Sequence, residues 1–110
     1  MKKLLLGLMF VCTGVHAGVY ENGNTLLKDM DGTEMGRMYA LGYIVGAADA
    51  YGGESLCIPT TVTKGQLNDV VYRFLKINPQ HRDLAADVLV LIALGEHWAC
   101  PKTDKNRRKS

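Results

Sequence analysis

Apolar residues at helical spacing mark the segment between Thr63 and Asn78 as an amphipathic helix. Its stripe consists of residues three and four apart: Leu67, Val70, Val71, Phe74 and Leu75. Thr63 and Gln66 have the spacing of a capping box at its start. Asn78-Pro79 ends it, because the residue before a proline avoids helical geometry while the proline suits the first turn of a new helix. Two helices joined by almost no loop should run antiparallel, so the sequence predicts a helical hairpin.

The second helix of this hairpin is predicted from Pro79 to His97. Seven consecutive apolar residues, 88–94, occupy its centre, so it should be the most buried element. Three of its side chains are expected in the core against Leu67, Val71 and Phe74: Val88, Leu91 and Ile92. Asp83 and Asp87 lie one turn apart near its start. That spacing suits a carboxylate pair for acid–base or metal chemistry, although a solvated end of an amphipathic helix explains it more simply.

A third helix is predicted from about Thr33 to Tyr51, with an N-cap at its start and Gly52-Gly53 at its end. Its expected apolar stripe is Met38, Leu41, Val45 and Ala48. Gly42 and Gly46 lie one turn apart and should admit a close neighbour, either a helix of the same core or a second subunit. With a short helical turn at 24–30 and an extended stretch at 57–62, the prediction is an all-α fold, a small bundle of about four helices.

The first seventeen residues have the pattern of a secretory signal peptide. Lys2 and Lys3 precede a short apolar stretch, and Ala17 ends a plausible cleavage site. The stretch is too short to span a bilayer, so no stable membrane insertion is expected. Lipid attachment at Cys12 is a weaker alternative, because no small residue of the required kind precedes it. The expected organisation is therefore a signal peptide at 1–17, a domain at 18–101 and a basic, disordered tail at 102–110, located in the periplasm.

Charge is distributed unevenly over the chain without its signal. Residues 18–101 carry six basic and ten acidic residues, a formal charge of −4, whereas the tail carries five basic residues and one acid. An acidic body does not suit nucleic acid, which binds basic surfaces. We therefore expect no nucleic-acid partner.

Two cysteines, Cys57 and Cys100, remain after signal cleavage. An even number in an exported chain suggests a disulfide, and a domain of this size gains from a cross-link. Cys57 precedes the predicted hairpin and Cys100 follows it, so a disulfide should close its open end. A zinc site is the rival interpretation, but neither cysteine has a CxxC partner, and His81 and His97 are the only histidines beyond the signal. No metal is expected.

Motifs for catalysis are missing from the sequence. It contains no GxSxG, no HExxH, no glycine-rich phosphate loop and no DxDxDG calcium loop. His97 lies near a helix end, where it favours the helix dipole. The sequence therefore predicts no enzyme and no cofactor, but a binding protein of the cell envelope.

Six blocks in order give the chain a resemblance to the Rap/Tai immunity proteins of bacterial type VI secretion. They are Asn22 to Leu27, Gly42 to Ala50, Cys57 to Pro59, Thr63 to Leu67, Asn78-Pro79 followed by Arg82, and Ala93-Leu94 followed by Trp98 to Pro101. The resemblance implies a protein that binds and blocks a peptidoglycan amidase toxin in the periplasm, often as a homodimer. Family members usually have a second cysteine pair. Met30 and Ala40 stand at or near those places here, which suggests that packing replaces that disulfide.

Occlusion of an amidase cleft requires a protruding element, and the loop after the third helix is the best candidate. The candidate partner-binding residues are Tyr51, Gly52, Gly53, Glu54 and Ser55, followed by Leu56. Tyr51 would supply an aromatic anchor and Glu54 a charge for a basic rim. An ordinary surface turn is the simpler interpretation of these residues. A different function, an acid-stress chaperone of the periplasm, stays open because the body carries ten acids.

Overall fold

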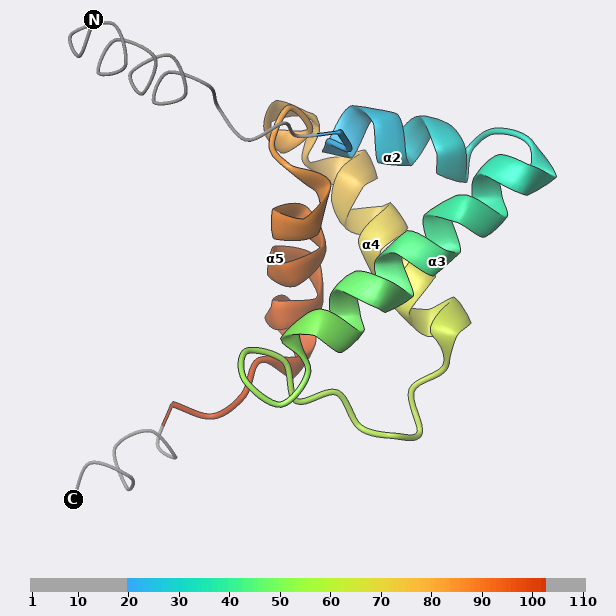
Figure 1. Ribbon diagram of the computed structural model, residues 1–110. Helices are drawn as coiled ribbons and strands as arrows, with labels where there is room; N and C mark the ends of the chain where they lie inside the picture. Colours follow the sequence, from blue (N-terminus) through green and yellow to red (C-terminus); the bar gives the residue numbers. More distant parts are fainter. Residues whose placement is uncertain (1–19, 103–110) are drawn as a thin grey trace, which may run out of the picture.

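The structure, a computed structural model, describes residues 20–102 (Figure 1). Within this range the chain forms four α-helices and one short 3₁₀ helix, and the predicted all-α class is confirmed. The elements are α2 (Gly23–Met30), α3 (Glu34–Tyr51), α4 (Lys64–Ile77), η1 (Pro79–His81) and α5 (Ala86–Trp98). The predicted signal peptide and all but the first residue of the predicted tail lie outside the described residues.

Side-chain caps start three of the helices. Thr63 and Gln66 form the expected capping box of α4, in which each side chain accepts a backbone N–H of the other residue at 3.1 and 2.7 Å. Asn22 and Thr25 form the same arrangement at α2, and the Thr33 hydroxyl accepts the Gly36 amide at α3. These polar residues fix the helix starts because they satisfy amides that lack a partner within the helix.

The second helix of the hairpin starts later than predicted. Pro79 begins only the short η1, and α5 starts at Ala86. The residues between them pair with the segment entering α2, since Gly23 N–H donates to Leu84 O and Ala86 N–H donates to Glu21 O. Asp83 therefore lies before α5 rather than one turn from Asp87 on the same helix, and the considered carboxylate pair does not form.

Arg82 closes the end of α4 from this same segment. Its guanidinium donates to Leu75 O at 2.6 Å and to Lys76 O at 3.0 Å. These carbonyls lie in the last turn of α4, where helical partners are missing. A long side chain thus stabilises the corner between α4 and α5.

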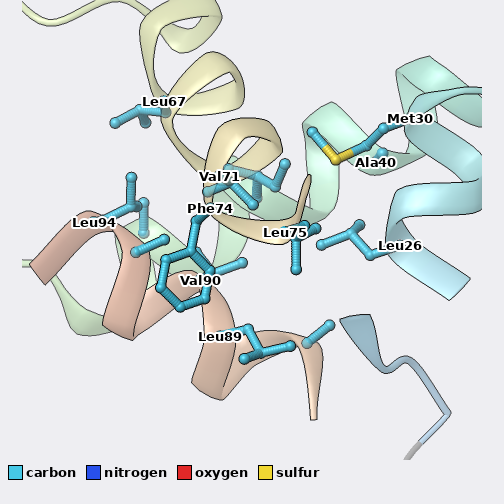
Figure 2. Close-up of a cluster of buried hydrophobic side chains, with 14 of the residues drawn as sticks. Leu26, Met30, Ala40, Leu67, Val71, Phe74, Leu75, Leu89, Val90 and Leu94 are labelled. Atoms are coloured by element: carbon cyan, nitrogen blue, oxygen red, sulfur yellow. The ribbon is translucent and has the colours of Figure 1, made fainter. Parts of the chain in front are cut away.

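The core lies between α4 and α5 and is covered by α2 and α3 (Figure 2). The buried residues of α4 are Leu67, Val71, Phe74 and Leu75, in agreement with the predicted stripe; those of α5 are Ala86, Leu89, Val90, Ala93 and Leu94. The expected core position was wrong for two of the three residues named in α5. Val88 is 41% exposed and Ile92 is 43% exposed, whereas Leu91 is half-buried and packs against the core. A helix that is apolar all round does not reveal which face its neighbours cover.

The buried face of α3 agrees with the predicted one only in part. Ala48 is buried as predicted, together with Ala40 and Ile44, whereas Met38 is 68% exposed and Leu41 and Val45 are half-buried. Gly42 is exposed, as is Gly46, and a Cβ added at either position would meet no atom of the described residues within 4 Å. The expected close helix neighbour within the core is therefore wrong for these glycines.

Met30 and Ala40 are both buried, at 7% and 0% exposure, in the same core cluster. Figure 2 shows both side chains among the buried residues of this cluster. α2 and α3 are thus joined by apolar packing at these two positions. The Tyr72 hydroxyl adds a link from α4 by donating to the Asp31 carboxylate at 2.7 Å.

Candidate partner-binding site

The loop after α3 is a tight, exposed turn fixed by its own backbone. Residues 52–55 are exposed, and Leu56 is buried beneath them at 1% exposure. Gly53 has φ = 85°, a left-handed conformation that other residues rarely adopt, and its N–H donates to Leu56 O at 2.8 Å. Leu56 N–H donates back to Tyr51 O at 3.0 Å. These bonds present Glu54 and Ser55 at the apex of the turn.

The predicted disulfide joins Cys57 and Cys100, with a Cα–Cα distance of 4.8 Å. Two backbone hydrogen bonds flank it: Cys57 N–H donates to Trp98 O at 2.8 Å, and Cys100 N–H donates to Ser55 O at 3.1 Å. The segment that follows α5 is therefore paired with the loop at three points. Because the cross-link closes α4 and α5 at one end and η1 joins them at the other, the two helices run in opposite directions, as predicted.

An open groove of about 580 Å³ borders the loop. Its walls come from α3, from the connector that leads to α4 and from the start of α4. The lining residues are Val45, Ala48, Asp49, Gly52, Gly53, Leu56, Cys57, Ile58, Val62, Lys64 and Leu67. A hollow whose walls are about equally polar and apolar, with one acid and one base among them, can accept an apolar side chain of a partner and orient a polar one.

Tyr51 is less free than the sequence suggested. It is half-buried, and its hydroxyl donates to the Asp87 carboxylate in the first turn of α5 at 3.4 Å. Burial, and then the neighbouring Asp87 charge, raise the pKa of the Tyr51 hydroxyl. Of the five candidate residues, Tyr51 thus positions the loop, while Gly52, Gly53, Glu54 and Ser55 form its exposed surface.

Metal and membrane sites are not apparent in the part of the chain that the structure describes. Within residues 20–102, no three His, Cys, Asp or Glu side chains gather as metal ligands would. None of the helices in this range combines the length and hydropathy that crossing a membrane requires. His97 packs beside Trp98, with ring centroids 5.6 Å apart.

The groove was missed by reasoning from the sequence. Three segments of the chain build it, and their relative placement depends on the disulfide and on the packing of α3 against α4. The signal in the sequence was the set of apolar residues Leu56, Ile58 and Val62 in the connector between α3 and α4. Leu56 is buried, Ile58 and Val62 are half-buried, and all three line the groove.

Comparison with known proteins gives one clear result. The model of the family described as Rap1a immunity proteins matches residues 22–100, from the N-cap of α2 to the second cysteine of the disulfide. A search of curated proteins finds no match. The match spans all four described α-helices, well over half of the chain, and so the chain belongs to the Rap1a immunity protein family.

Proposed function

We propose that this protein is a periplasmic immunity protein that binds and inhibits a cognate peptidoglycan amidase effector of type VI secretion. The family match over residues 22–100 carries the proposal, because an immunity protein acts by binding the toxin from which it protects its producer. The amidase target comes from the resemblance of the sequence blocks described above. Binding without catalysis is consistent with the lack of catalytic motifs in the sequence.

Export to the periplasm is part of the proposal. The pattern of residues 1–17 supports it, and so does the disulfide between Cys57 and Cys100, since such bonds form in oxidising compartments. Sequencing the N-terminus of the protein recovered from periplasm tests this part. A mature chain that begins at Gly18 is the expected result, and a chain that retains Lys2 and Lys3 contradicts it.

The exposed turn at 52–55 enters the effector's cleft in this proposal. Its backbone is fixed by internal hydrogen bonds and by the disulfide, so little conformational freedom is lost on binding. Glu54 faces solvent and supplies a negative charge for a basic rim or a catalytic imidazolium. The adjoining groove receives an apolar side chain from the effector.

A homodimer also belongs to the proposal. The open strip of α3 at Gly42 and Gly46 gives a second copy room for close approach. Sedimentation at several protein concentrations tests it, and a molecular mass of one chain at every concentration contradicts it.

The decisive experiment co-expresses the protein in the periplasm with the amidase encoded beside it. We expect lysis with the amidase alone and survival when the immunity protein is present. Glu54→Ala should weaken protection, whereas Glu96→Ala, which removes an exposed carboxylate from α5, should not. Persistent lysis with the wild-type protein overturns the proposed function. Equal protection by wild type and Glu54→Ala, with equal affinity, removes Glu54 from the interface and leaves the function standing.

The chaperone alternative predicts a different result. It requires the protein to suppress aggregation of unrelated proteins at low pH, without a specific partner at neutral pH. Light scattering of an aggregating test protein at acidic pH separates the two functions.

A further inference from the structure

The connector between α3 and α4, residues 52–63, buries few side chains, although its turn is held by hydrogen bonds of its own. Leu56 is its only buried residue, and Ile58 and Val62 are half-buried. The other connector residues are exposed. Beyond Leu56, the attachment of this segment to α5 consists of the disulfide and the two backbone hydrogen bonds beside it.

The helices do not depend on this attachment in the same way. Every buried core residue other than Leu56 belongs to α2, α3, α4 or α5. Neither cysteine is among the buried residues: Cys57 is exposed and Cys100 is half-buried. Loss of the cross-link therefore removes an anchor of the connector without opening a cavity in the core.

The same anchor shapes the candidate partner-binding site. Ser55, in the exposed turn, accepts a hydrogen bond from Cys100 N–H, and Leu56, Cys57 and Ile58 form one wall of the groove. The turn and the wall share a single covalent attachment to the end of α5, and Cys57 at one end of it is an exposed residue. A disulfide at an exposed residue is a candidate for reduction by a soluble thiol.

We propose that the Cys57–Cys100 disulfide is a redox latch on the partner-binding site. In the reduced protein the turn and the groove wall lose their covalent attachment to the end of α5, while the hydrogen bonds within the turn remain and the four helices stay folded. The protein is then competent to bind its partner only after oxidation, which prevents engagement before export. This inference takes the identity of the partner-binding site from the proposed function. The redox control of the connector does not depend on the proposed function.

The chemistry is thiol–disulfide exchange. A thiolate of a dithiol attacks Sγ of Cys57, the sulfur–sulfur bond breaks, and Cys100 leaves as a thiolate that takes up a proton. The second thiol of the dithiol then attacks the mixed disulfide and releases Cys57, and the dithiol becomes a cyclic or intramolecular disulfide. A disulfide oxidant reverses both steps and closes the latch.

Hydrogen exchange on the full chain tests the latch without any effector. Two amides report on this attachment, because their hydrogen bonds join the connector to the end of α5: Cys57 and Cys100. On reduction with dithiothreitol at neutral pH, we expect both amides to exchange at least about tenfold faster, while far-ultraviolet circular dichroism still shows the folded helices. Unchanged exchange at the two amides overturns the proposal. Loss of the helical signal on reduction also overturns it, because it shows global unfolding.

Two variants complete the test. The Cys57→Ser, Cys100→Ser variant should show fast exchange of the amides at positions 57 and 100 with or without reductant. Leu89→Ala, in which a core residue is truncated, should lower the global stability by a similar amount and yet leave these two amides slow as long as the disulfide is intact. If Leu89→Ala produces the same pattern as reduction, the effect is one of stability and the latch is refuted.

Affinity for the amidase encoded beside the gene adds a functional arm. The oxidised form should bind at least about tenfold more tightly than the reduced form, a difference of about 1.4 kcal/mol. Equal affinity of the two forms overturns the latch and leaves the proposed function standing. No binding by the oxidised form overturns the proposed function, and the exchange pattern then decides the latch alone.

Discussion

Truncation of Leu89 and of Ile92 should have very different costs, although the two residues are one turn apart on α5. Leu89 is fully buried, whereas Ile92 is 43% exposed. Each of the two substitutions by alanine removes three carbon atoms, which contribute about 2.4 kcal/mol of transfer free energy when they are fully buried. Leu89→Ala also leaves a cavity that water does not fill, so the expected loss is about 3–5 kcal/mol. Ile92→Ala loses only part of the transfer term, leaves no closed cavity and gains helix propensity, so we expect about 1 kcal/mol.

Urea unfolding of the two oxidised variants, followed by circular dichroism, measures this difference. The slope of the free energy of unfolding against urea should stay unchanged, so that the midpoints report stability directly. A cost for Ile92→Ala equal to that of Leu89→Ala would refute the orientation of α5. It would restore the arrangement in which Val88, Leu91 and Ile92 form the core.

Three further outcomes follow from the loop and from α3. Reducing Cys57–Cys100, which are 43 residues apart, should lower the free energy of unfolding by about 4 kcal/mol in the chain-entropy model, as measured by urea titration with and without dithiothreitol. Gly53→Ala should cost about 1–2 kcal/mol because its φ of 85° is unfavourable with a Cβ, and an unchanged melting temperature would contradict this. Burial, and then the charge of Asp87, raise the pKa of Tyr43. The neutral phenol is therefore favoured in the folded state. Its contribution to the free energy of unfolding is present below about pH 10 and is lost as the pH rises above that value. Tyr43→Phe should reduce this loss of stability at alkaline pH in unfolding experiments.

Local signals in the sequence predicted the start of α4 and its buried stripe correctly. Thr63 and Gln66 act within one turn of the chain, and the stripe from Leu67 to Leu75 has polar residues between its members that fix the orientation of the helix. The disulfide was predictable for a related reason. An antiparallel hairpin brings its outer ends together, even though the segment between α4 and α5 proved longer than predicted.

Tertiary contacts decided what the sequence left undetermined. The seven apolar residues of α5 carry no polar marker of the exposed side, so the positions of α3 and α4 select Leu89, Val90, Ala93 and Leu94 for the core. The late start of α5 has a similar cause. Hydrogen bonds from the residues that enter α2 hold the segment before Ala86 in a nonhelical conformation. No feature of the sequence near Pro79 indicates that this segment pairs with residues so far away in the chain.

The same limit applies to the candidate site, and it changes which variant is informative. Tyr51 looks like a hot-spot residue in the sequence, but its hydroxyl bonds Asp87 and its ring is half-buried. Tyr51→Ala would disturb the end of α3 as well as any interface, so a loss of binding would not locate the partner. Tyr51→Phe removes the bond to Asp87 and retains the ring. Glu54 is exposed at the apex of a turn whose backbone bonds do not involve its side chain, so Glu54→Ala tests contact with the partner alone.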